Sequence, residues 1–130
     1  MKTTAVVTGA ASGMGRILAA RLARKGATVH ALDRDAGALA ALASEQPSIV
    51  PHAIDVTDAA ALDLLLRPLA ASVDLVVTAA GIGHTGRIAE TEPATFARLM
   101  AVNYLGTIAT IAPVLPSMVE RGRGRIVLFA

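Results

Sequence analysis

The sequence contains no cysteine and no tryptophan, and its 130 residues include only two phenylalanines and one tyrosine. Without cysteine, the chain forms neither a disulfide framework nor a thiolate metal site. The His, Asp and Glu residues show no metal-ligand spacing either, so we expect no bound metal. The formal net charge of +2 is too small to favour a nucleic-acid partner.

Long apolar runs are absent as well. No run approaches the roughly 20 residues that span a bilayer. Near the N-terminus, Thr8, Gly9 and Ser12 interrupt the apolar stretch that a signal peptide requires. We therefore expect a cytoplasmic protein without a membrane partner.

The apolar residues, 54% of the chain, are mostly Ala, Val, Leu and Ile. This composition is typical of buried parallel strands covered by closely packed helices, and the length fits one domain over residues 1–130. Strand patterns at 4–8, 28–32, 48–54, 73–79 and 126–129 alternate with helical patterns. We expect helices over 14–25, after Asp35, after Thr57 or Asp58, and from Pro93 towards Arg121 with a bend near Pro113 and Pro116. The alternation predicts a parallel α/β sheet.

Three glycines, Gly9, Gly13 and Gly15, lie within TGAASGMG at residues 8–15, between the first predicted strand and helix. A helix N-terminus presents unpaired N–H groups and a positive dipole end, which suit a pyrophosphate if no Cβ holds it away. A tight turn with close helix–strand packing is the alternative, and it would need fewer glycines. The spacing is neither G-x-G-x-x-G nor the P-loop pattern, because the loop has no lysine.

The T-G-x-x-x-G-x-G spacing resembles that of the short-chain dehydrogenase/reductase family. The resemblance extends over the chain through Asp33 at a strand end, DV at 55–56, TAAG at 78–81, MAVNYLGT at 100–107 and RGRGRIVLFA at 121–130. It implies a Rossmann-type doubly wound parallel sheet of order 3-2-1-4-5, truncated after the fifth strand. It also implies NAD(P)-dependent hydride transfer between an alcohol and a carbonyl, with such a small molecule as the substrate.

The choice between NAD and NADP depends on Asp33, about 20 residues beyond the glycines, where an acid binds ribose hydroxyls and repels a 2′-phosphate. Ser12 stands where family members that prefer NADP often carry a basic residue, so we expect NAD. By resemblance, Asp55 and Val56 contact the adenine, and Ala80 and Gly81 approach the cofactor. The predicted cofactor-binding residues are Gly9, Ser12, Gly13, Met14, Gly15, Asp33, Asp55, Val56, Ala80 and Gly81.

Asn103 is the one catalytic candidate, because it resembles the family's helix asparagine that holds a water of the proton relay. The family's Asn-Asn-Ala-Gly is here Thr-Ala-Ala-Gly, so we expect its asparagine hydrogen bonds to be lost. The family's catalytic serine and Tyr-x-x-x-Lys are missing: the only tyrosine is Tyr104, and Ile108 stands four residues later. We expect a cofactor-binding front part that is inactive alone. His84, after Gly81, is a weaker ligand candidate.

Two other functions stay open. One is a non-catalytic nucleotide-binding or interaction module, and the other, less favoured by the glycine spacing, is a methyltransferase that binds S-adenosylmethionine. Self-association of the chain is also expected. The apolar edge strand 125–130 and the helix residues Leu105, Ile108, Ile111 and Leu115 would be uncovered, so we expect a homo-oligomer.

Overall fold

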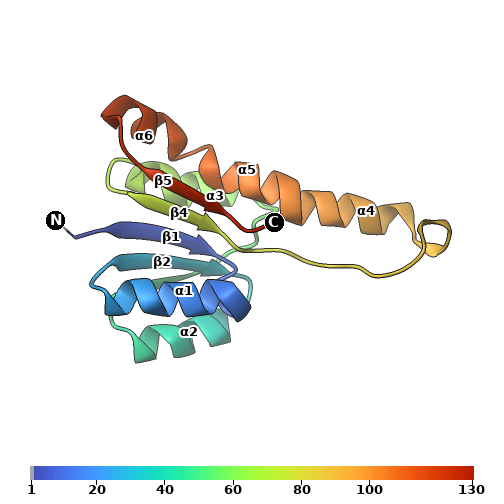
Figure 1. Cartoon of the computed structure of the whole chain (residues 1–130), viewed down its shortest axis with the longest axis horizontal. Helices are drawn as coiled ribbons and strands as arrows, with labels where there is room; N and C mark the ends of the chain where they lie inside the picture. Colours follow the sequence, from blue (N-terminus) through green and yellow to red (C-terminus); the bar gives the residue numbers. More distant parts are fainter. Residues whose placement is uncertain (1) are drawn as a thin grey trace.

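A computed structural model describes residues 2–130. Its centre is a five-stranded parallel sheet of order β3-β2-β1-β4-β5. Figure 1 labels β2, β1, β4 and β5 side by side in this order. The strands are β1 (Thr4–Thr8), β2 (Thr28–Asp33), β3 (Ile49–Ala53), β4 (Leu75–Thr78) and β5 (Arg125–Leu128). The order confirms the predicted Rossmann-type sheet, and the strands fall within about two residues of the predicted ranges.

Helices cover both faces of the sheet. They are α1 (Gly13–Arg24), α2 (Ala36–Glu45), α3 (Ala59–Leu66), α4 (Pro93–Met100), α5 (Gly106–Ile111) and α6 (Leu115–Arg121), with 3₁₀ turns at Arg67–Leu69 and Ile88–Glu90. Val7 packs with Leu39 and Leu42 on the face of α1 and α2, whereas Val6 packs with Leu62 and Leu66 on the opposite face. Adjacent residues of β1 thus enter different cores, because side chains alternate along a strand.

Aspartates begin two of the helices. The side chain of Asp35 accepts a hydrogen bond from the Ala38 N–H at 2.9 Å, and that of Asp58 accepts one from the Ala61 N–H at 3.0 Å. Both are N-caps, which satisfy a backbone donor that the helix leaves unpaired. The structure thus selects Asp58, rather than Thr57, as the cap of α3.

The long helix expected from Pro93 to Arg121 is divided into segments. A wide π turn at Ala101–Leu105 joins α4 to α5, and a 41° bend separates Pro93–Ile111 from Leu115–Arg121. The bend lies beside the two prolines, as predicted, because proline removes a helical N–H and clashes with the preceding turn. The π turn, which contains Asn103, was not predicted.

Pro51 lies in β3 at one edge of the sheet, where a missing N–H is tolerated. Within residues 2–130, no single helix is long and apolar enough to cross a membrane, although Pro93–Ile111 and Leu115–Arg121 taken together across their bend meet both criteria.

Candidate cofactor-binding site

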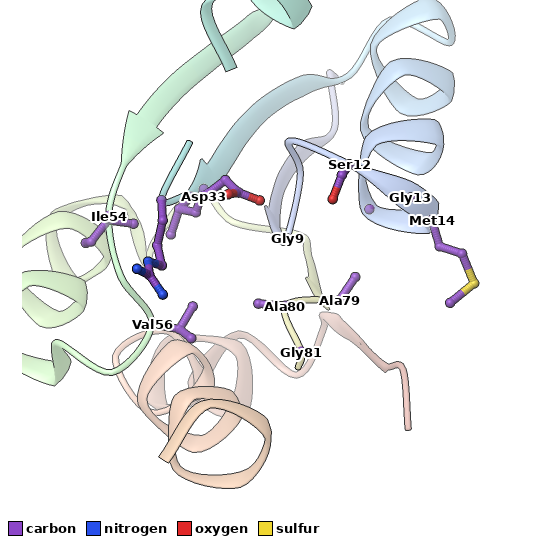
Figure 2. A pocket seen from close by; sticks show the side chains of 13 residues that line it. Gly9, Ser12, Gly13, Met14, Asp33, Ile54, Val56, Ala79, Ala80 and Gly81 are labelled. Atoms are coloured by element: carbon purple, nitrogen blue, oxygen red, sulfur yellow. The ribbon is translucent and has the colours of Figure 1, made fainter. Parts of the chain in front are cut away.

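A cleft of about 310 Å³ opens where β1, β2 and β4 end, beside the N-terminus of α1 (Figure 2). Four segments line it: the glycine loop, the end of β2, the loop after β3 and the loop after β4. Nine of the ten predicted cofactor-binding residues lie in its wall, namely Gly9, Ser12, Gly13, Met14, Gly15, Asp33, Val56, Ala80 and Gly81. Leu32, Arg34, Ile54 and Ala79 complete the lining. The parallel sheet brings these segments together because its strands all end at the same edge.

Two of the three loop glycines are required by packing within the protein. Gly9 has a φ of +65°, and a Cβ there would lie 2.6 Å from the Ala79 carbonyl oxygen. A Cβ on Gly15 would overlap the carbonyl of Gly9. These positions let the loop after β4 and the start of α1 approach the end of β1, so the packing alternative holds for Gly9 and Gly15.

Gly13 is different, because apart from its chain neighbours and its own helix no protein atom lies within 4 Å of the place its Cβ would take. It has a φ of +56° and lies in the cleft wall at the first turn of α1. The Ser12 side chain makes no capping bond, and the first turn carries no acid. The N–H groups and the positive dipole end therefore face the cleft uncompensated, as an anion-binding site requires.

Asp33 connects the glycine loop to the end of β2. Its Oδ2 accepts a hydrogen bond from the Ala11 N–H at 3.1 Å, and its Oδ1 accepts one from the Asp35 N–H at 3.0 Å. The carboxylate is thus held at the cleft wall by two backbone donors. Each oxygen retains a lone pair that can accept a ribose hydroxyl.

Asp55 lies outside the cleft lining, although its neighbour Val56 belongs to it. Its Oδ1 accepts hydrogen bonds from the N–H and the hydroxyl of Thr57, at 2.9 and 2.8 Å. These bonds, chiefly the one from the Thr57 backbone, hold the pKa of Asp55 below its usual value. The Arg34 guanidinium lies 3.5 Å from Asp55 Oδ2. The carboxylate therefore shapes a turn beside the cleft, and its contact with adenine stays a prediction.

The loop after β4 is held by a residue that the site prediction missed. The buried Thr8 hydroxyl accepts hydrogen bonds from the Ala79 and Ala80 N–H groups, both at 3.2 Å. These bonds tie β1 to the Thr-Ala-Ala-Gly segment, where we expected the family's asparagine bonds to be lost. The available signal was a hydroxyl at the end of a buried apolar strand, directly before the glycine loop.

The Asn103 side-chain amide holds the same loop at Ile82, two residues beyond Ala80. Its Oδ1 accepts from the Ile82 N–H at 2.9 Å, and its Nδ2 donates to the Ile82 carbonyl at 2.8 Å. Both ends of the amide are therefore engaged by backbone, while the Asn103 carbonyl accepts from the Thr107 hydroxyl at 2.9 Å. Asn103 fixes the loop beside the cleft, and its part in a proton relay stays a prediction.

The remaining candidates lie away from the cleft. His84 is exposed, and its Nε2 lies 3.1 Å from the Thr91 hydroxyl. A second hollow, of about 530 Å³, shares Ala79, Ala80 and Gly81 with the cleft and extends over Asn103 towards Phe129. Among the described residues, no three His, Asp or Glu side chains are grouped closely enough to hold a metal ion.

A doubly wound sheet with an uncapped helix N-terminus, a glycine at its opening and an acid at the end of β2 is typical of a Rossmann-type domain. The family profile described as short chain dehydrogenase matches residues 3–130. The chain belongs to the short-chain dehydrogenase/reductase family.

Two curated relatives act on sugar acids by their names. The chain is 40% identical over 122 residues to the 2-keto-3-deoxy-L-fuconate dehydrogenase of Xanthomonas campestris, covering 94% of this chain and 40% of that protein. It is 38% identical to the 2-dehydro-3-deoxy-L-rhamnonate dehydrogenase (NAD(+)) of a Sphingomonas species, covering 97% and 52%. The chain thus spans about half the length of the curated relatives it matches.

Solved structures agree on the fold. A short-chain dehydrogenase from Streptomyces avermitilis superposes with a TM-score of 0.92 at 31% identity, covering 98% of this chain and 49% of that one. Similar structures include a Brucella melitensis 3-oxoacyl-[acyl-carrier protein] reductase with bound NAD (33% identity, TM-score 0.89) and an actinorhodin polyketide ketoreductase with NADPH (29%, 0.91). They cover 97% and 99% of this chain and 52% and 53% of their own. Both cofactors therefore occur among close structural neighbours.

Proposed function

We propose that this chain binds NAD in the glycine-loop cleft and forms the cofactor-binding portion of a dehydrogenase that interconverts an alcohol and a carbonyl. The observation that carries the proposal is the open space at Gly13, in front of the uncapped first turn of α1. Packing accounts for Gly9 and Gly15, whereas at Gly13 the φ of +56° favours glycine and the open Cβ position leaves room in the cleft wall for a pyrophosphate.

Each cleft residue then has a defined part. The first-turn N–H groups of α1 hold the pyrophosphate, and Asp33 accepts the adenosine ribose hydroxyls. Within residues 2–130, the Val56 N–H has no protein acceptor, so it is free to donate to the adenine. Gly81 gives the nicotinamide half access along the loop after β4. When bound, NAD supplies the site that accepts or donates the hydride.

The preference for NAD over NADP rests on charge. Asp33 would face a 2′-phosphate, and Ser12 offers no cation to neutralise it. Arg34 is the nearest cation in the cleft wall, and its guanidinium is directed to Asp55. The acid at the end of β2 therefore outweighs the arginine that follows it.

The same proposal extends to the substrate, the assembly and the location of the protein. The substrate is a small alcohol or carbonyl compound, as the sugar-acid names of the relatives suggest. Leu105 and Ile108 are 57% and 49% exposed on the helix that runs past the second hollow, which favours a homo-oligomer. We place the protein in the cytoplasm.

A pair of glycine substitutions tests the proposal. Gly13 and Gly122 have φ values of +56° and +63°, and no protein atom lies within 4 Å of either Cβ position, but only Gly13 lines the cleft. An alanine at either position costs about 1–2 kcal/mol of backbone strain. We expect Gly13→Ala to weaken NAD binding by at least about tenfold in calorimetry, because the new methyl group meets the pyrophosphate. Gly122→Ala should leave the affinity unchanged.

Three outcomes separate the candidate functions. Binding of NAD that both variants retain equally would place the nucleotide elsewhere and overturn the proposal. Binding of S-adenosylmethionine in preference to NAD would identify the methyltransferase alternative. NAD binding to a natural protein of this length, with no longer product of the same gene by intact mass, would favour the non-catalytic module.

A further inference from the structure

Gly106 is a buried glycine at the start of α5, directly after the π turn. A glycine within a helical segment destabilises it by about 0.5–1 kcal/mol relative to alanine. Its φ is not in the left-handed region, so the backbone conformation does not require glycine. The surroundings do. A Cβ here would lie 2.7 Å from Val56 Cγ2, 3.0 Å from Val56 Cβ and 3.3 Å from the Val56 carbonyl oxygen.

This contact cannot be relieved by a change of rotamer at Val56. Rotation about χ1 moves the two Cγ atoms, but the Cβ and carbonyl oxygen stay where the backbone places them. A methyl group on residue 106 therefore pushes on the main chain of Val56 as well as on its side chain.

The main chain around Val56 is a short turn that is held together by its own hydrogen bonds. The Asp55 carboxylate binds the N–H and hydroxyl of Thr57, and the Asp55 carbonyl accepts from the Asp58 N–H at 3.0 Å. Asp58 in turn caps α3. We therefore expect a displacement of the Val56 main chain to shift residues 55–58 together, rather than to change a single torsion angle.

The other side of this turn is the cofactor cleft. Val56 is only 8% exposed, and it lines the cleft together with Ile54 and the end of β2. In Figure 2 its side chain lies between the cleft and the orange helix. Val56 also borders a separate groove of about 390 Å³ beside Leu105, so space exists into which a displaced side chain can move.

We infer that Gly106 is a positioning residue of the cofactor site: its missing side chain lets α5 approach Val56 and thereby sets the wall and the free N–H at one end of the cleft. The inference rests on the proposed cofactor site, in which this end receives the adenine. Gly106 touches no ligand itself. It acts through Val56.

The test compares Gly106→Ala with Gly37→Ala. Gly37 also lies in a helix, and its Cβ position has only an ordinary contact, 3.6 Å from Asp35 Oδ1. Calorimetry with ADP-ribose, which has the adenosine half of the cofactor, should show about five- to tenfold weaker binding for Gly106→Ala, the loss expected from one misaligned hydrogen bond. Gly37→Ala should bind like the unsubstituted protein. Equal affinity of all three proteins would overturn the inference.

A second measurement needs no ligand. Amide chemical shifts of residues 55–58 should change in Gly106→Ala more than those of other segments in contact with α5. If the unsubstituted protein binds no ADP-ribose while these shifts change as expected, the proposed function fails and only the effect of Gly106 on the Val56 turn stands. Shifts at 55–58 that match those of Gly37→Ala would remove that role.

A double substitution guards against a variant that does not fold. Val56→Ala removes the Cγ2 atom that makes the shortest contact. In the Gly106→Ala background it should recover part of the lost thermal stability, because the contacts with the Val56 Cβ and carbonyl oxygen remain, so that the two effects are not additive. Strictly additive losses would show that Gly106 does not serve Val56.

Discussion

Removing the charge of Asp33 should abolish the preference for NAD over NADP. If the 2′-phosphate of NADP lies about 4 Å from the carboxylate, each unit of charge costs about 1 kcal/mol in water and about 4 kcal/mol near a protein surface. Asp33 is half-buried at the rim of an open cleft, so the cost falls between these limits. Since 1.4 kcal/mol is tenfold in affinity, we expect the protein to favour NAD by about ten- to a hundredfold.

The structure also shows that Asp33→Ala does more than remove a charge. It deletes the acceptor for the Ala11 and Asp35 N–H groups, which hold the glycine loop and the turn after β2. Water can replace part of these bonds, so the loss of stability is about 1–2 kcal/mol. NAD affinity should therefore fall for two reasons at once. Asp33→Asn is the sharper variant, because it removes the charge and retains one acceptor oxygen.

The measurement is the ratio of the NAD and NADP dissociation constants by calorimetry, because loop disorder weakens both cofactors alike and cancels in the ratio. Asp35→Ala is the matched control: it removes the cap of α2, and Asp35 does not line the cleft. We expect the ratio to approach one for both Asp33 variants and to stay unchanged for Asp35→Ala. Equal affinity of the unsubstituted protein for the two cofactors would refute the reasoning.

Three further predictions concern pH, turnover and assembly. His30 Nδ1 lies 3.0 Å from His52 Nε2, and burial lowers the pKa of both side chains. The neutral pair therefore stabilises the fold above the ordinary histidine pKa, and this stabilisation is lost as the pH falls through the lowered pKa values. The melting temperature of the unsubstituted protein should thus fall more between pH 7 and pH 5 than that of His52→Gln. Parallel dependence of the two melting temperatures on pH would contradict this. The chain alone should form no NADH from alcohols, because Tyr104 has no lysine four residues later. Measurable NADH formation that a glycine-loop substitution abolishes would disprove this. Sedimentation should show a dimer or larger species, and Ile108→Glu should weaken this assembly. Leu64→Glu, at a 78% exposed position on α3, should leave the assembly unchanged. A monodisperse monomer at micromolar concentration would exclude the assembly.

The strand and helix order could be predicted because short-range patterns carry it. Alternating apolar runs and helical patterns gave the five strands in sequence, and the caps at Asp35 and Asp58 use a side chain and a backbone donor three residues apart. The bend near Pro113 and Pro116 follows from proline chemistry alone. The π turn was not predicted, and the partners of its residues are distant in sequence: Asn103 within it binds Ile82, and Gly106 directly after it approaches Val56.

The cleft residues could be predicted as a set, but their individual parts could not. The glycine spacing pointed to one purpose, close approach of a phosphate, and the structure separates two packing glycines from Gly13. Thr8 was overlooked because its partners, Ala79 and Ala80, are 71 and 72 residues away. The paired rings of His30 and His52 likewise meet across two strands, with centroids 5.2 Å apart.

The sequence by itself determined the sheet order, the place of the glycine loop at the end of β1 and the acid at the end of β2. The sheet order follows from the resemblance to the family, and the two positions follow from local propensity and from the rule that parallel strands end at one edge. Only the tertiary structure decided which atoms meet there: that Asp33 holds Ala11, that Asn103 holds Ile82, and that Gly106 makes room for Val56. Such pairings are sensitive to changes of a few tenths of an ångström in the distances between segments far apart in the chain. Packing sets these distances only after the whole sheet has formed.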